Sequence, residues 1–171
     1  MNIELVTLRI IHILGGIFWV GSLTFTSFFL VPVIRSSPAV AGQVMAGLQK
    51  RRLFTVLPIV ALLTIASGLR LLSIASAGFS GAYFGTTPGR TFGAGAVAAI
   101  VAFLLSLLVG RPAFVRVGRL GASLAATTDE SERQRITAEM QRLNRRATIA
   151  NGIVVALLLL TAVGMAIARY L

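Results

Sequence analysis

The N-terminal part of the chain contains an unusually long apolar stretch at residues 8–35, LRIIHILGGIFWVGSLTFTSFFLVPVIR. A helix of this length crosses a lipid bilayer. The stretch contains His12, the only histidine of the chain, and an ionisable side chain inside a membrane helix is a candidate functional residue because burying it is costly. Residues three, four and seven positions apart share a helix face, which places Gly15, Gly16 and Trp19 beside His12. The two glycines leave room for a neighbouring helix or for a flat ligand coordinated by the imidazole.

Three further apolar stretches follow the first one. Of the 171 residues, 56% are hydrophobic and only 12% are charged, a composition typical of integral membrane proteins and not of soluble domains. We therefore predict an all-α fold, an integral membrane four-helix bundle that forms a single transmembrane domain over residues 1–171. The expected spans are about 5–33, 53–77, 92–110 and 147–168.

The positive charges are unevenly distributed along the chain, whose formal net charge is +11. One group consists of Arg35 and residues 50–52, and a larger group of arginines lies between residues 111 and 146. Both groups follow an odd-numbered span, so the positive-inside rule places them in the cytoplasm and both termini on the outer, periplasmic side. This pattern predicts a multi-pass protein of the bacterial inner membrane that contacts anionic lipids, and it argues against nucleic-acid binding.

Residues 129–146 have the pattern of an amphipathic cytoplasmic helix. Thr128 or Asp129 is the expected cap, acidic residues follow in the first turn, and arginines collect at the end. This segment either lies on the cytoplasmic membrane surface or extends the fourth span inward.

The chemistry of His12 suggests one cofactor in particular. A single imidazole is sufficient for five-coordinate haem iron, whereas the chain has no cysteine for a thiolate metal site. Haem also carries two carboxylates, and Arg9 and Arg70 lie toward the outer side with no acidic residue inside the spans to pair with them. These arginines would hold the haem propionates or, alternatively, lipid phosphates. The other interpretation of His12 is a neutral imidazole that hydrogen-bonds a neighbouring helix.

The order of several motifs resembles the CopD-like and HemJ-like family of small four-helix bacterial membrane proteins. The resemblance rests on HILGGIFWVG at 12–21, KRRLF at 50–54 and LPIVALLTIASGLRLL at 57–72. It implies a b-type haem on His12 and a haem-dependent oxidoreductase activity. Together with the helix face and the two arginines described above, the predicted cofactor-binding residues are His12, Arg9, Gly15, Gly16, Trp19 and Arg70, with His12 as the metal ligand. HemJ-like proteins oxidise protoporphyrinogen, but they carry a histidine and a lysine at the start of the third span, where this chain has RTFGAGAVA at 90–98. This difference argues against that reaction here.

Three functions remain open at the level of the sequence. The first is a haem- or porphyrin-binding protein with a redox or porphyrin-handling role. The second is an accessory subunit of a larger membrane complex or of a homo-oligomer. The third is a copper or small-ion transporter, although one histidine and no cysteine make a poor set of copper ligands.

Overall fold

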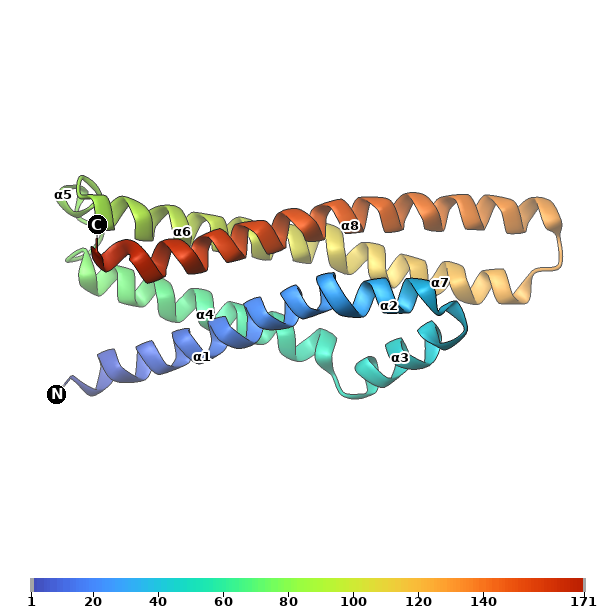
Figure 1. Ribbon diagram of the computed structural model, residues 1–171, viewed down its shortest axis with the longest axis horizontal. Coiled ribbons are helices and arrows are strands. Elements are labelled where there is room, and N and C mark those ends of the chain that lie inside the picture. The colour runs from blue at the N-terminus through green and yellow to red at the C-terminus, as the bar shows by residue number, and fades with distance from the viewer. Residues whose placement is uncertain (1, 171) are drawn as a thin grey trace.

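Four long helices form an elongated bundle in the computed structural model, which describes residues 2–170 apart from the side chains of residues 38–41 and 169 (Figure 1). The described part of the chain contains no β-strand. The principal helices are α1 (Ile3–Phe25), α4 (Leu53–Ala75), α6 (Thr87–Leu105) and α8 (Glu130–Ile167). The shorter elements are η1 (Thr26–Leu30), α2 (Val31–Ser36), α3 (Pro38–Lys50), α5 (Gly81–Phe84), η2 (Ser106–Gly110), α7 (Arg111–Ala126) and η3 (Ala168–Tyr170). The expectation of an all-helical bundle is confirmed.

Several of these elements join into longer continuous helices. The segment from α1 through α2 has 34 residues and the segment from α6 through α7 has 40, while α8 alone has 38. Together with α4, these are four helices that are long and apolar enough to cross a membrane. The arm expected at 129–146 and the fourth apolar stretch therefore belong to one helix, α8.

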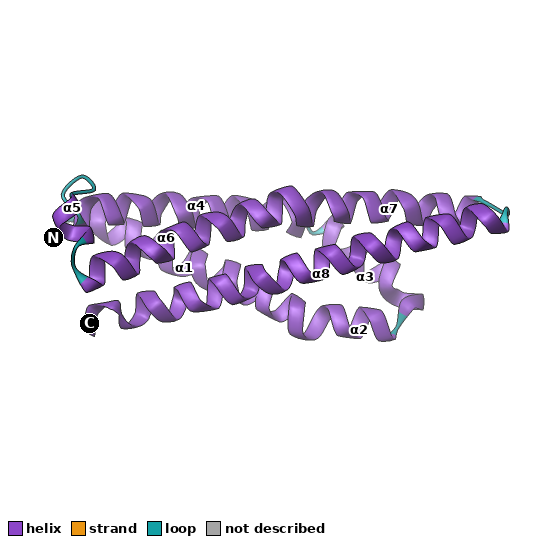
Figure 2. Cartoon of the chain, turned by 90° about the horizontal axis from the view of Figure 1, so that it is seen from above, coloured by secondary structure: helices purple, strands orange, loops and turns teal. Residues whose placement is uncertain are grey.

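The helices run alternately up and down, and they pack in two pairs. Helix α1 packs mainly on α4, and α6 packs mainly on α8, while α4 and α6 join the two pairs. Both chain termini and α5 lie at one end of the bundle, and the α7–α8 turn projects from the other end (Figures 1 and 2). The α7–α8 hairpin is longer than the α2–α3 connection and extends past it.

Two π-helical turns interrupt the long helices, each just before a proline. Pro32 and Pro112 lie at the start of α2 and α7. Proline has no N–H, and its ring clashes with the carbonyl four residues earlier, so the preceding turn widens. In each widened turn a serine, Ser27 or Ser106, donates its hydroxyl to the carbonyl four residues back, at 2.6 and 2.9 Å. The first helix thus continues past Pro32 to Ser36 and does not end at the proline.

The buried core lies midway along the bundle and draws on all four long helices. Its buried members are Trp19, Ala61, Ala102, Val154 and Leu158. Trp19 is only 3% exposed and meets Phe103 edge to face, with 6.4 Å between ring centroids. The two alanines leave room for this indole, because large and small side chains alternate in a close-packed interior. Trp19 is therefore a core residue that joins the two helix pairs.

Candidate functional site

His12 makes a hydrogen bond across the α1–α4 interface. Its Nδ1 lies 2.8 Å from the backbone carbonyl oxygen of Thr64. A carbonyl oxygen only accepts, so Nδ1 carries the proton and, in the neutral ring, Nε2 keeps the free lone pair. Within the described part of the chain Nε2 has no hydrogen-bond partner. The hydroxyl of Ser67 donates mainly to the Leu63 carbonyl, at 2.7 Å, and more weakly to the Thr64 carbonyl, at 3.1 Å.

Glycines allow α1 and α4 to approach closely at this level. A Cβ on Gly68 would lie 2.6 Å from Cε1 and 2.9 Å from Nδ1 of His12, closer than side chains normally come. A Cβ on Gly15 would overlap the hydroxyl of Thr64, whereas one on Gly16 would make an ordinary contact of 3.8 Å with the Thr64 methyl group. We expected Gly15 and Gly16 to make room either for a neighbouring helix or for a flat ligand. In the structure, α4 packs against both glycines. One side of the imidazole is packed against Gly68 of α4.

The two arginines expected to hold propionates differ in their surroundings. Arg70 pairs with Glu4: its Nη2 and Nε lie 2.6 and 2.8 Å from the same carboxylate oxygen. Arg70 thus has an acidic partner that the sequence analysis had placed outside the spans, because the N-terminal turn of α1 brings Glu4 to the C-terminal end of α4. Both side chains are about half exposed, so the pair contributes little to stability. Arg9 is exposed and makes no ion pair with any described residue.

The remaining expected site residues do not gather around His12. Trp19 belongs to the core described above. A shallow apolar hollow of about 300 Å³ does lie beside Arg9, but it is formed by one face of α1 alone and does not include His12. Among the described residues no three histidine, cysteine or acidic side chains are grouped so that they could hold a metal ion.

A second polar cluster, which the sequence analysis did not identify, joins α8 to the first helix on the other side of the apolar core from His12. The side-chain amide of Asn151 donates to the hydroxyl of Ser27 at 2.6 Å, and Arg35 donates to the hydroxyl of Thr148 at 2.5 Å. The only sequence signal for this contact was an asparagine at the start of an apolar stretch. The cluster is separated from His12 by the apolar core.

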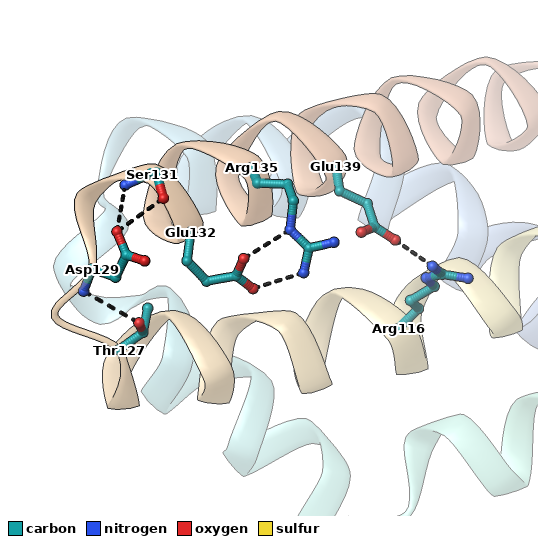
Figure 3. A network of polar contacts seen from close by, with 7 residues as sticks. All are labelled: Arg116, Thr127, Asp129, Ser131, Glu132, Arg135 and Glu139. Atoms are coloured by element: carbon teal, nitrogen blue, oxygen red, sulfur yellow. Dashed lines mark hydrogen bonds and ion pairs between the residues drawn. The ribbon is translucent and has the colours of Figure 1, made fainter.

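The α7–α8 hairpin carries a network of ion pairs and capping hydrogen bonds (Figure 3). Asp129 caps α8 by accepting hydrogen bonds from the hydroxyl and the backbone N–H of Ser131, which lower the pKa of its carboxyl group. The hydrogen bonds from Arg135 likewise lower the pKa of Glu132. Asp129 is thus the helix cap, one of the two that the sequence suggested.

An ion pair joins the two helices of the hairpin. Arg116 of α7 lies 2.5 Å from Glu139 of α8, and the two side chains point toward each other across the hairpin (Figure 3). Glu139 is only 20% exposed, whereas Arg116 is 65% exposed and keeps part of its guanidinium group accessible.

Comparisons with protein-family models, with curated proteins and with solved structures gave no match to this chain. The resemblance to CopD-like and HemJ-like proteins therefore stays a prediction from the motifs quoted above.

Proposed function

We propose that the protein is a multi-pass protein of the bacterial inner membrane with both termini on the periplasmic side. The exterior of the bundle supports membrane insertion, since large apolar side chains such as Ile17, Val97 and Leu160 are 63–70% exposed along the helices. The orientation is supported by the two basic groups, which lie toward the end of the bundle opposite the termini.

Single cysteines test this orientation directly, because the chain has none of its own. Ala82 of α5 and Ala126 at the end of α7 are both exposed and lie at opposite ends of the bundle. In sealed cells an impermeant thiol reagent should label a cysteine at position 82 and should label one at position 126 only after lysis. Equal labelling of both before lysis would contradict the four-span topology.

We propose further that Nε2 of His12 is the axial ligand of a b-type haem or a related tetrapyrrole, with a redox or porphyrin-handling role. The observation that carries this proposal is the hydrogen bond from Nδ1 to the Thr64 carbonyl. Metal-binding histidines usually donate their other ring N–H to a carbonyl or carboxylate, which fixes the tautomer and makes the ligand nitrogen more basic. When bound, haem supplies one-electron chemistry that no amino-acid side chain offers.

The surroundings of His12 constrain how such a cofactor would bind. Because α4 fills the space next to Gly15 and Gly16, a flat ligand has to approach His12 from the outside of the α1–α4 pair. Arg9 is available for a propionate, whereas Arg70 would have to exchange the Glu4 carboxylate for one. The tautomer of His12 therefore suits a metal ligand, whereas a propionate on Arg70 requires its ion pair with Glu4 to open.

The decisive variant is His12→Asn, because the asparagine amide can still donate toward the Thr64 carbonyl but is a poor ligand for haem iron. Wild-type protein expressed with ample haem should purify with a Soret absorbance band, and His12→Asn should fold and insert but be colourless. A colourless wild-type protein, or an unchanged Soret band in the variant, would refute His12 ligation.

An accessory subunit of a larger membrane complex is the second candidate. It is favoured by the contacts of His12, since the bond to Thr64 and the fit against Gly68 also suit an imidazole that only joins two helices. In that case gentle solubilisation should yield a colourless protein together with larger subunits. Copper or small-ion transport has no comparable support, because the two polar clusters are separated by the apolar core.

A further inference from the structure

A groove on α7 combines positive charge with apolar side chains. Its charged members are Arg111, Arg116 and Arg119. Its apolar members on the same side of the helix are Leu107, which precedes these arginines, Val115, which lies between them, and Leu120, which follows them. The groove is open, with a volume of about 770 Å³. A surface that alternates guanidinium groups with apolar carbon suits an amphiphile better than a small inorganic anion, which would leave the apolar part unused.

The charges in this groove are largely unpaired. Arg111 and Arg119 make no ion pair or side-chain hydrogen bond with any described residue, and Arg116 is held by Glu139. The three arginines and one glutamate leave a net positive charge at the groove. Guanidinium groups bind phosphate oxygens through paired N–H donors, so an anion with several oxygens is the complementary ligand.

The position of α7 places these arginines where lipid headgroups would lie. Arg111 directly follows the π-helical turn at the end of the third apolar stretch, and Arg119 is eight residues further, about 12 Å along the helix axis. Side chains on a helix lean toward its N-terminus, which for α7 is the direction of the bilayer. Arg116 and Arg119 therefore lean back toward the level of Arg111.

We propose that this groove binds the headgroup of an anionic phospholipid of the cytoplasmic leaflet, with Arg111 and Arg119 on the headgroup phosphate and with Leu107, one turn toward the bilayer, along the upper part of the acyl chains. The proposal rests on the membrane topology given above, but it does not depend on His12 or on any haem.

The test is lipid binding to the full-length protein in detergent, measured by native mass spectrometry with dioleoyl phosphatidylglycerol and dioleoyl phosphatidylcholine. The double variant R111Q/R119Q removes the two unpaired charges of the groove. The double variant R142Q/R145Q is the matched control, because it removes the same charge from exposed positions of α8 outside the groove.

Wild-type protein should bind phosphatidylglycerol about thirtyfold more tightly than phosphatidylcholine, the ratio that corresponds to two basic residues each contributing about 1 kcal/mol near a lipid surface. R111Q/R119Q should lose this preference, and R142Q/R145Q should keep it. Three results would overturn the proposal. The first is an equal loss of the phosphatidylglycerol preference in both variants, which would mean that the positive charges attract lipid without a specific site. The second is a wild-type protein with no preference, and the third is displacement of the lipid by millimolar inorganic phosphate. Because the measurement is made in detergent, an inverted topology would leave its result unchanged and would appear only in the cysteine labelling.

Discussion

The contact between His12 and Gly68 can be tested by adding one carbon atom. In Gly68→Ala the new Cβ would lie 2.6 Å from Cε1 and 2.9 Å from Nδ1 of His12. Carbon atoms in contact are normally about 3.5–4.0 Å apart, so either the imidazole or the helix must shift by roughly 1 Å. We expect the shift to break the hydrogen bond to the Thr64 carbonyl.

Gly16→Ala is the matched control, because it lies in the same helix pair and its new Cβ would be 3.8 Å from the nearest atom of Thr64. Both variants gain up to about 1 kcal/mol in helix propensity, and this gain cancels in the comparison. Overpacking costs about 1–3 kcal/mol, and a lost interhelical hydrogen bond costs about 0.6 kcal/mol. Gly68→Ala should therefore be about 2 kcal/mol less stable than Gly16→Ala.

Reversible unfolding in mixed detergent micelles measures this difference. Nitrogen-15 NMR of the imidazole provides a second and independent measurement, and its signal is unambiguous because the chain has one histidine. The wild type should show a proton on Nδ1 that is hydrogen-bonded, and Gly68→Ala should alter that signal. Equal stability of the two variants, together with an unchanged imidazole spectrum, would refute the close packing of His12 on Gly68.

Two further predictions concern contacts made by α8. In a double-mutant cycle of Asn151→Ala and Ser27→Ala, unfolding measurements should give a coupling energy of about 0.6 kcal/mol, with about 1.7 kcal/mol as an upper bound, and zero coupling would mean that the bond is absent. Asp129 has a lowered pKa in the folded protein, so its cap contributes above the unfolded-state value of about 4 and is lost as the pH falls through the folded-state value. Amide protection in the first turn of α8 should consequently decrease below about pH 4, and Asp129→Ala should abolish this pH dependence; a wild-type first turn that keeps its protection at low pH would contradict the assignment of the cap.

The helical fold could be predicted from the sequence because it depends on local properties. In a membrane, long apolar stretches with few charges form helices whatever their neighbours are, because each helix satisfies its own backbone hydrogen bonds. A composition with 56% hydrophobic residues is typical of such a protein and not of a soluble domain. The cap at Asp129 was also local, since its partner Ser131 is two residues away. The widened turns before Pro32 and Pro112 also have a local cause, the proline itself. A proline in the sequence, however, does not show whether the helix ends there or continues, and in the structure both helices continue.

The contacts of the candidate site depend on tertiary structure. The partners His12 and Thr64 are 52 residues apart, Glu4 and Arg70 are 66 apart, and Ser27 and Asn151 are 124 apart. Helical periodicity shows which residues share a face, but the partner of that face is set by how far each helix slides and rotates against its neighbour. A slide of one turn moves a side chain by about 5.4 Å, more than a hydrogen bond spans. For this reason the sequence identified His12 as unusual, and only the packing of α1 on α4 determined that Thr64 binds its Nδ1 and that Gly68 makes room for its ring.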